Sequence, residues 1–377
     1  MKSTRQHTFH HQAGFSLIEI LVGLAIGLLA TLVIMQVFSV FEGQKRTTTG
    51  AADAQTNGSI ALYSIGQELK MAGYGLLPTI GASPLGCTTM NFSSTGMTGI
   101  SPVTVTDGGA AAGASDSITI RYGNSASGGV PSQIKGFGLT GPNDITLANN
   151  QGCQVGDVAM IVSGTTCNFT SVTPTATPDT VTVTLQDPAI VPASPTNFSL
   201  SCLGTWHSVV FQVNPAYNPT SATNSQAYLV RSDASFPVPA VGNPPAAPTV
   251  ADIVNIQAQY GISAIAGSNL VTQWVDATGS WAAPSVADRN RIKAVRVAVV
   301  ARSGLYEKTV VTNACSSLTT AYPTGLCAWD ATSASPATAS PAPKIDLSND
   351  PNWQHYRYRV FETIVPLRNM IWAKDAL

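Results

Sequence analysis

Charge is scarce in this sequence, and neither sign dominates. Asp, Glu, Lys and Arg make up 10% of the 377 residues, and the formal net charge is −1. A surface that binds nucleic acid needs an excess of basic residues to neutralise phosphates, so direct contact with nucleic acid is not expected. Gly, Pro, Ser, Thr and Ala are abundant instead, which is typical of a secreted β-rich protein rather than of a charged cytosolic enzyme.

The motifs of common catalytic and phosphate-binding sites are absent as well. The chain has no GxSxG, HExxH or GxxxxGK[ST], and no GxGxxG after a predicted strand. Asp346 and Asp350, in DLSNDPN, lack the spacing of an EF-hand. His207 lies at the edge of a predicted strand, where a packed or surface role is expected. The sequence therefore predicts no catalytic residue, no metal, no cofactor and no small-molecule substrate.

The six cysteines form no CxxC pair and are not spaced with the histidines as zinc ligands. An even number at wide spacing, in Thr-, Ser- and Pro-rich surroundings, favours disulfides in an oxidising compartment over buried free thiols. Short loops close most easily, so we predict Cys153–Cys167 and Cys315–Cys327, which leaves Cys87–Cys202.

A long apolar run near the start is the first strong positive signal. No charged residue lies between Glu19 and Glu42, and the run Ile20–Phe41 is 22 residues long. As an α-helix it would extend about 33 Å, which is enough to cross the hydrocarbon core of a bilayer. We therefore predict a membrane-spanning helix.

The residues before this run are arranged unlike an ordinary secretory signal, whose cleavage site follows the apolar segment. Here a polar leader, MKSTRQHTFHHQAG, comes first, and Gly14 precedes the apolar run. Cleavage after Gly14 would leave the helix on the mature chain and create an amino terminus at Phe15, about one helical turn before Glu19.

Glu19 needs a partner, because a carboxylate in hydrocarbon costs about 2.5–3.5 kcal/mol. The new ammonium group at Phe15, in the same chain or in a neighbour, would supply one. The acid would then set the register between neighbouring helices. The alternative is an acid that reaches the membrane edge.

GFSLIE, preceded by a basic leader and followed by a long apolar helix, resembles the class III signal of type IV prepilins and type II secretion pseudopilins. The resemblance implies that a prepilin peptidase cleaves after Gly14 and N-methylates Phe15, and that Glu19 aligns subunits in a filament. Gly23 and Gly27 form GxxxG in the predicted span, which allows close helix packing, although glycine is also tolerated in membrane helices generally.

Beyond the apolar run the helix is predicted to continue in amphipathic form. Small and apolar residues recur at steps of three and four, at Ala54, Gly58, Ala61, Ile65 and Leu69. Gly73, Gly75 and Pro78 end this pattern. The fold class predicted is α+β, with a long N-terminal helix packed on an antiparallel β-sheet head with large loop insertions, as in the type IV pilin fold.

Eight runs in the head are predicted as strands: 116–123, 157–164, 179–187, 207–213, 226–232, 252–262, 291–303 and 356–367. The predicted organisation has four parts: a cleaved leader (1–14), a transmembrane or filament-core helix (15–42), an amphipathic helix extension (43–75) and a periplasmic β-rich head (76–377).

The C-terminal third carries a narrower resemblance. QAQYGI, a Trp-containing stretch, RIKAVRVAVVARS and YRYRVFETIVPLRNMIW together resemble the PilW family of minor pilins, whereas residues 80–250 match nothing comparable. The same third is locally basic. The pattern indicates a solvated sheet face or, alternatively, a face that docks a partner or DNA, formed by Arg291, Lys293, Arg296, Arg302, Arg357 and Arg359.

The resemblance implies a minor pilin that helps prime a type IV pilus and is incorporated near its tip, in support of twitching motility, adhesion or DNA uptake. Its expected partners are other minor pilins, the major pilin, the prepilin peptidase and the inner membrane. The expected location is a single pass of the bacterial inner membrane with a periplasmic head, then the pilus and cell surface, and no enzyme activity is expected. Two alternatives remain: a type II secretion minor pseudopilin, and a membrane-anchored surface adhesin that binds through the middle of the chain.

Overall fold

The structure is a computed structural model, and it describes residues 14, 16–76, 84–93, 96–97, 99–138, 142–150, 152–175, 181–187, 198–238, 242–317, 323–329 and 342–372. The chain divides into two compact units, Met1–Ala52 and Asp53–Leu377. The boundary falls inside a single helix, and each unit is described by itself below.

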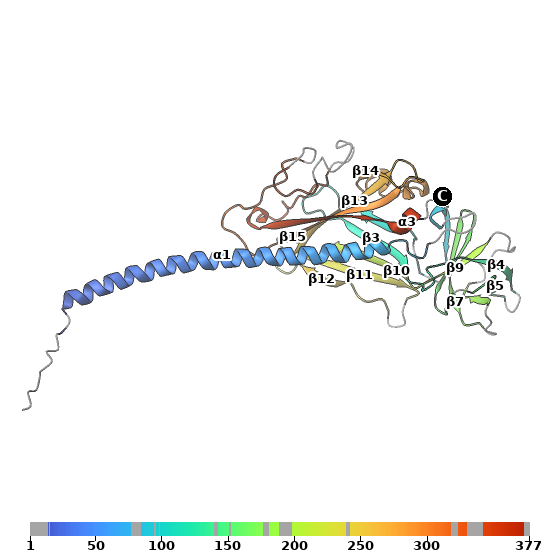
Figure 1. The fold of residues 1–377 in the computed structure, drawn as a ribbon, viewed down its shortest axis with the longest axis horizontal. Helices are drawn as coiled ribbons and strands as arrows, with labels where there is room; N and C mark the ends of the chain where they lie inside the picture. Colours follow the sequence, from blue (N-terminus) through green and yellow to red (C-terminus); the bar gives the residue numbers. More distant parts are fainter. Residues whose placement is uncertain are drawn as a thin grey trace, which may run out of the picture. The chain divides into compact units, whose positions relative to one another are not determined.

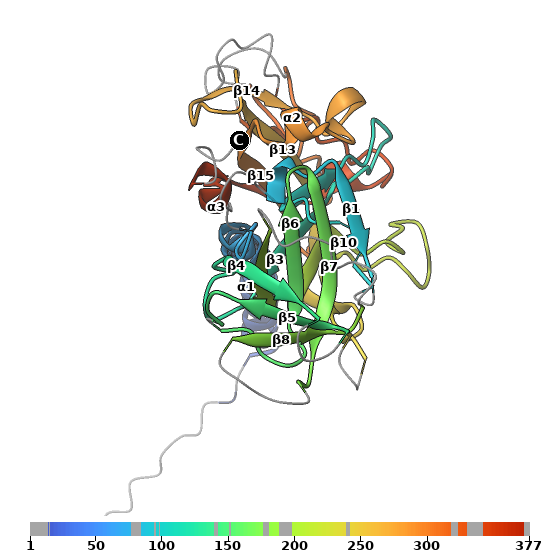
Figure 2. The same cartoon turned by 90° about the vertical axis from the view of Figure 1, so that its right-hand side faces the viewer.

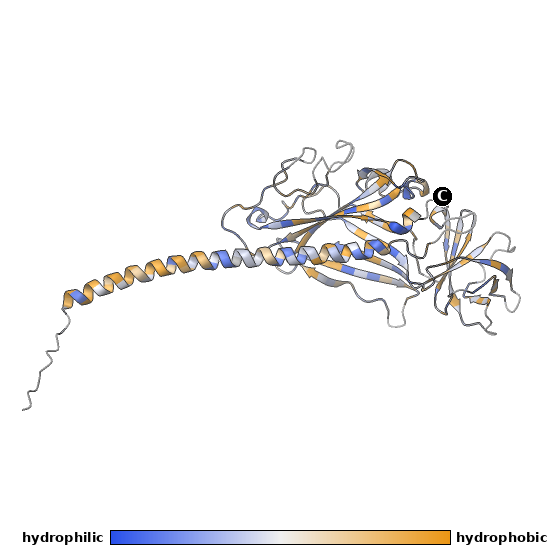
Figure 3. Cartoon of the chain, viewed as in Figure 1, coloured by the Kyte–Doolittle hydropathy of each residue, from blue (hydrophilic) through white to orange (hydrophobic). Residues whose placement is uncertain are grey.

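Helix α1 (Leu17–Met71) is 55 residues long (Figure 1). In the first unit the residues from Ile20 to Phe41 are mostly Leu, Ile, Val and Ala, and the hydropathy colouring of α1 in Figure 3 shows this hydrophobic stretch. The length and composition of α1 would allow it to cross a membrane. The helix ends close to the predicted position, because Gly73 and Gly75 adopt positive φ angles of 74° and 91°.

Two antiparallel sheets form most of the second unit. The five-stranded sheet has the order β12-β11-β10-β3-β2, with bounds β2 (Val103–Thr106), β3 (Ser117–Gly123), β10 (Trp206–Val213), β11 (Tyr228–Phe236) and β12 (Ala247–Ala251). The four-stranded sheet has the order β14-β13-β15-β16, with bounds β13 (Ile253–Ser263), β14 (Val271–Val275), β15 (Ile292–Arg302) and β16 (Tyr358–Pro366). We call these two sheets, their connections and residues 53–76 of the chain the body.

A third set of strands closes into a ring, which Figure 2 shows facing the viewer. Its order is β7-β6-β9-β4-β5-β8, and β8 pairs back onto β7. The bounds are β4 (Ser132–Phe137), β5 (Asp144–Leu147), β6 (Val158–Ser163), β7 (Thr166–Thr173), β8 (Thr182–Leu185) and β9 (Ser199–Gly204). We call residues 124–205 the barrel. Strand β1 (Thr89–Phe92) lies outside the ring and pairs with β7 in parallel.

Short helices occupy several connections: η1 (Pro84–Gly86), η3 (Gly279–Trp281), α2 (Val286–Arg289), η5 (Trp353–His355) and α3 (Arg368–Trp372). Helix α3 lies at the end of α1, where the Asn369 amide donates to the Ala72 carbonyl at 2.9 Å. That contact satisfies one of the carbonyl groups that a helix C-terminus leaves without an intrahelical partner.

Body and barrel have separate hydrophobic cores, and strand β6 contributes to both. Val158, Met160 and Val162 belong to the core of the body, whereas Ala159 and Ile161 belong to the core of the barrel. This is the period-two alternation of a strand that is covered on both faces.

The same alternation determines the disulfides and corrects two predicted pairings. Cys167 faces the body core and bonds to Cys87, and Cys202 belongs to the barrel core and bonds to Cys153. The predicted pairs Cys153–Cys167 and Cys87–Cys202 were therefore wrong, because loop length was used without the direction of each side chain. The third bond, Cys315–Cys327, agrees with the prediction.

Candidate functional site

Three residues with predicted roles in processing and assembly, Gly14, Phe15 and Glu19, lie at or just before the start of α1. The structure describes Gly14 and Glu19. Gly14 lies just before the helix, and a Cβ added to it would meet no atom within 4 Å. Phe15 and the leader before Gly14 lie outside the described residues. The predicted cleavage after Gly14 and methylation of Phe15 therefore stay predictions.

Glu19 has a partner in the isolated chain. The Ser16 amide donates to Glu19 Oε2 at 2.9 Å, and Ser16 Oγ accepts from the Ile18 amide at 3.4 Å. This arrangement is close to a capping box, in which a Ser and an acid three residues later satisfy amides at a helix start. The sequence SLIE already has the Ser-x-x-Glu spacing of this motif. Glu19 can thus be hydrogen-bonded before any second subunit is present.

Between Ile20 and Phe41 the first unit presents a nearly continuous apolar surface. Leu24 and Leu32 are 64% and 50% exposed, and Phe38 is 70% exposed. A Cβ added to Gly23 or Gly27 would meet no atom within 4 Å, so both glycines leave open surface on this helix. Such a surface needs lipid or other helices around it. Helix packing through these two glycines stays a prediction.

In the second unit, α1 is seated on the body by the predicted stripe. Ala54, Ala61, Ile65 and Leu69 are at most 1% exposed and belong to the main core. Gly58 packs directly against β16, because an added Cβ would lie within 3 Å of three ring atoms of Phe361. The small residues of the stripe therefore allow close contact between helix and sheet.

A charged network fixes the last turns of α1 to the five-stranded sheet. Glu68 accepts from Tyr122 Oη at 2.8 Å and from Arg231 Nη2 at 2.7 Å. Arg231 also lies 3.5 Å from Asp233, whose carboxylate is 3.1 Å from His207 Nδ1. Glu68 lies on the same helix face as Ala61 and Ile65, seven and three residues earlier.

The network shifts the ionisation of its members. Burial and the hydrogen bond to the Glu68 carboxylate raise the pKa of the Tyr122 phenol above its usual range. Burial disfavours the charged form of Asp233, but the hydrogen bonds and charges of His207 and Arg231 hold the pKa of its carboxyl below its usual value. His207 also stacks on Tyr122, with ring centroids 5.2 Å apart. It has the packed role expected for it.

The predicted basic face is wrong as a solvated surface, because strand β15 is covered on both sides. Lys293 and Arg296 are 1% exposed. Lys293 Nζ donates to the Ala266 carbonyl at 2.8 Å, and the Arg296 guanidinium lies 4.7 Å from the ring centroid of Trp329 and 5.1 Å from that of Trp274. Burial lowers the pKa of Arg296 to about 10.

Three of the other four cations of this group have acidic neighbours. Arg291 lies 3.0 Å from Asp288, Arg302 lies 3.7 Å from Asp350, and Arg357 lies 3.0 Å from Glu307. Arg359 is exposed at the edge of the sheet. Apart from Arg359, these positive charges are therefore dispersed into ion pairs and the core.

The aspartates considered for calcium are also engaged by the protein. Asp346 accepts from the backbone and hydroxyl of Ser348 and lies 3.1 Å from Lys344 Nζ, while Asp350 accepts from the Asn352 amide. Among the residues that the structure describes, no group of three or more His, Cys, Asp or Glu side chains could hold a metal.

Comparisons with known proteins give two family matches. Residues 9–35 match the prokaryotic N-terminal methylation motif, and residues 218–369 match the type IV pilus-assembly protein W family, PilW. Among solved structures, a type IV-like pilin from Thermus thermophilus is similar over 84% of this chain and 96% of its own, with 10% identity and a TM-score of 0.34. No curated protein matches the chain.

A methylation motif at the start of a long apolar helix, followed by antiparallel sheets that seat the same helix, defines a type IV pilin. The match over residues 218–369 covers β11 to β16 and includes the segments QAQYGI and RIKAVRVAVVARS and most of YRYRVFETIVPLRNMIW. Together, the two matches support a type IV pilus minor pilin of the PilW family, whose model covers the C-terminal part of the chain. Interaction with other pilins and with the pilus machinery follows from that family, and the motif and helix indicate membrane anchoring.

Proposed function

We propose that this pilin helps prime the assembly of a type IV pilus and is incorporated near the pilus tip. The observation that carries the proposal is the combination, in one chain, of the methylation motif at residues 9–35 and the PilW region at 218–369. The first supplies the processed helix by which pilins associate, and the second supplies a head of the minor-pilin type. Motility, adhesion or DNA uptake would then depend on this chain through the pilus.

The proposed route begins in the inner membrane, with residues 15–42 in the bilayer and the head in the periplasm. A prepilin peptidase cleaves after Gly14, and Phe15 becomes a methylated amino terminus. Glu19 then exchanges its bond to the Ser16 amide for an ion pair with the Phe15 amine of a neighbouring pilin. Only one axial stagger of the two helices brings these groups together, so the charge selects the register of assembly.

The capping geometry makes a sharp test possible, because Gln can accept the Ser16 amide bond as Glu does but carries no charge. We expect Glu19→Gln and Glu19→Ala to be inserted and cleaved, with an intact mass that starts at Phe15. Both should be lost from complexes co-purified with other pilins, and surface pili should fall in number. Glu42→Ala, which removes the acid at the other end of the apolar run, is the matched control and should assemble normally.

Each other outcome has a defined meaning. Normal assembly of Glu19→Gln together with failure of Glu19→Ala would show that the acid only caps the helix. A mature chain that starts elsewhere than Phe15 would contradict the processing step. Co-purification with secretion pseudopilins instead of pilus subunits would assign the chain to type II secretion.

A further inference from the structure

The barrel is inserted into what would otherwise be one β-hairpin. Gly123, the last residue of β3, lies opposite Trp206, the first residue of β10, in the register of the five-stranded sheet. The chain leaves the body after Gly123 and returns to it at Trp206. The hairpin end is closed by backbone bonds from Asn124 to Thr205 at 3.2 Å and from Ser125 to Leu203 at 3.0 Å.

Both covalent connections of the inserted residues therefore lie side by side on one two-stranded ribbon. A module attached in this way can turn about the ribbon unless other contacts restrain it. One restraint is the packing of Val158, Met160, Val162 and Phe169 against the body core. These contacts are apolar and carry little directional preference, so they resist separation more than they fix an angle.

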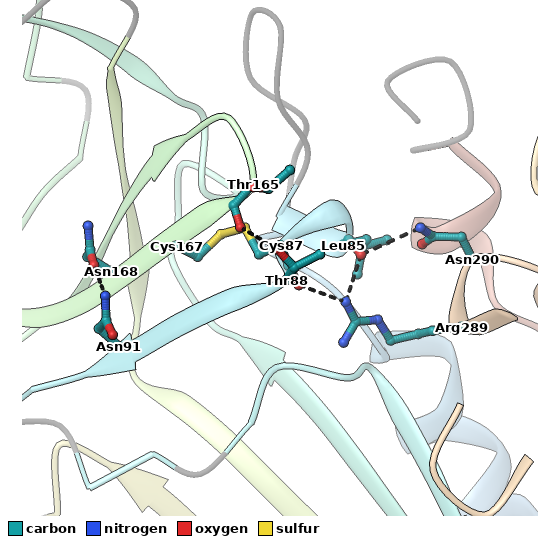
Figure 4. The surroundings of a disulfide bond; sticks show 9 residues. All are labelled: Leu85, Cys87, Thr88, Asn91, Thr165, Cys167, Asn168, Arg289 and Asn290. Atoms are coloured by element: carbon teal, nitrogen blue, oxygen red, sulfur yellow. Dashed lines mark hydrogen bonds between the residues drawn. A yellow bond between two sulfur atoms is a disulfide. The ribbon is translucent and has the colours of Figure 1, made fainter. Parts of the chain in front are cut away.

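A second attachment comes from a different part of the chain. Cys87 follows η1, outside the inserted residues, and its sulfur bonds to Cys167 near the start of β7 (Figure 4). The segment continues as β1, which runs parallel to β7 from the Thr89–Thr166 pair to the Phe92–Phe169 pair. Asn91 Nδ2 donates to Asn168 Oδ1 at 2.6 Å beside it. The disulfide and β1 thus hold the barrel at β7, away from the β3–β10 connection in the topology.

The body holds this attachment in turn through Arg289, at the end of α2. Its guanidinium Nη2 donates to the Leu85 carbonyl at 2.8 Å and to the Cys87 carbonyl at 3.4 Å, as Figure 4 shows. Arg289 is 7% exposed, and burial lowers its pKa. The buried guanidinium thus donates to two carbonyls at or beside the cysteine. In this way it links α2, which precedes β15 of the four-stranded sheet, to η1 and the disulfide.

We propose that Cys87–Cys167, seated by Arg289, is a clamp that fixes the orientation of the barrel on the body. The ribbon supplies the attachment, and the clamp removes the remaining freedom to turn. Because the barrel lies outside the matched range 218–369, the clamp would give this chain a rigidly presented module in addition to the PilW region. The inference depends only on the fold and holds whether or not the chain enters a pilus.

Distance measurement by electron paramagnetic resonance in the full-length protein tests the clamp. Spin labels are placed through non-canonical residues at Val155 in the barrel and Leu270 in the body, which are 64% and 70% exposed. We expect one narrow distance distribution for the unaltered chain, and loss of that narrow distribution in Cys87→Ala/Cys167→Val, which retains apolar volume. Arg289→Gln should broaden the distribution to a smaller extent.

The matched control is Cys315→Ala/Cys327→Val, which removes a disulfide from the body without touching the barrel and should leave the distribution narrow. Protease resistance of the barrel confirms that it remains folded in each variant. A narrow, unshifted distribution in the folded Cys87→Ala/Cys167→Val protein would show that apolar packing alone sets the orientation, and the clamp would be rejected. Equal broadening in the Cys315→Ala/Cys327→Val control would also reject it.

Discussion

In the body, β13 and β15 pair with each other along their length and are 11 residues long each, whereas the barrel contains strands as short as the four residues of β5 and β8. Every position of β13 is buried, and so are the first ten positions of β15. The long helix α1 adds a further apolar layer to the body. The barrel instead gains its cohesion by closing a ring of short strands around a small core.

The difference in core size between body and barrel indicates how much stability each region loses when a single contact is removed. A large core distributes its stabilisation over many side chains, and a small one needs covalent support because it buries too little apolar area. The barrel has that support in Cys153–Cys202, and it is also joined to η1 by Cys87–Cys167. The Cys315–Cys327 bond of the body closes a loop outside its main sheets.

Of the two disulfides that lie wholly within one region, Cys153–Cys202 should give the larger effect when removed, and the effect should stay in the barrel. The bond spans 49 residues, for which chain entropy predicts a loss of about 4 kcal/mol in Cys153→Ser/Cys202→Ser. Hydrogen exchange read by mass spectrometry should show faster opening of barrel peptides. All six tryptophans lie outside residues 124–205, so tryptophan emission reports the body. The melting temperature of the body, followed by this emission, should be almost unchanged.

Cys315→Ser/Cys327→Ser provides the comparison in the body. Its loop spans 12 residues, so the expected loss is smaller, about 3 kcal/mol, and local to the 315–327 segment. Equal loss of protection in body and barrel after removal of Cys153–Cys202 would mean that the two regions unfold as one unit, and the contrast drawn above would fail.

The same contrast explains what the sequence could predict. Strands β13, β15 and β16 and helix α1 were predicted close to their observed bounds, because IVNIQAQYGIS and IKAVRVAVVAR are long β-type runs and the helix has a clear stripe, whereas β14 was missed. Strands β4 and β9 were missed, since SQIKGF and SLSCLG are short and contain the Gly and Ser typical of loops. Closure of a ring depends on pairing between distant segments, which no local pattern contains.

The candidate site was predictable in part. The small and apolar stripe of α1 was confirmed, because periodicity alone identifies a buried helix face. The network around Glu68 was missed, since its partners Tyr122 and Arg231 lie on other elements. Lys293 and Arg296 were assigned to a solvated face because charge usually lies outside, and here a carbonyl and two indole rings stabilise them inside.

A further prediction concerns Asp116, which lies next to β3, contacts β13 of the other sheet of the body and is 4% exposed. Its carboxylate accepts from the Gly108 and Ala258 amides at 2.9 and 2.8 Å. Burial, helped by the charges of Asp107 and Asp276, outweighs these bonds and raises the pKa of Asp116 to about 7 from 3.8. The folded chain therefore retains a proton that the unfolded chain has lost between these two pH values, so stability should fall as pH rises through this window.

Thermal melting followed by tryptophan emission between pH 4 and pH 8 measures this slope, which is at most about 1.4 kcal/mol per pH unit for one proton. Asp116→Asn replaces the titratable carboxyl with a neutral amide. The plot of stability against pH should therefore be flatter for this variant by the contribution of one proton, whatever the stability of the variant at low pH. Other buried carboxyls, Asp252 and Asp276, have pKa values raised in the same direction, so the difference between the two proteins is the informative quantity. Identical slopes would show that Asp116 does not titrate in this window.

The smallest expected effect comes from two glycines of α1 that differ only in what faces them. At Gly58 an added Cβ would overlap the ring of Phe361, whereas at Gly66 it would meet no atom within 4 Å. Alanine at either position gains up to about 1 kcal/mol of helix propensity. At Gly58 the displaced ring costs about 1–3 kcal/mol, so Gly58→Ala should lower the stability of the body while Gly66→Ala raises it.

Tryptophan emission during denaturation measures both variants against the unaltered chain, and hydrogen exchange of the barrel serves as the internal reference. Because the ring of Phe361 is only partly buried, it has some room to rotate, and this limits the penalty at Gly58. The sign of the stability change nevertheless depends on the position of the glycine, since the two substitutions are chemically identical and lie on the same helix. If both alanines stabilised the body equally, the close seating of α1 on β16 would not hold, and the small residues of the stripe would need a different explanation. If Gly58→Ala destabilised barrel and body together, seating of the helix would be what couples the two regions.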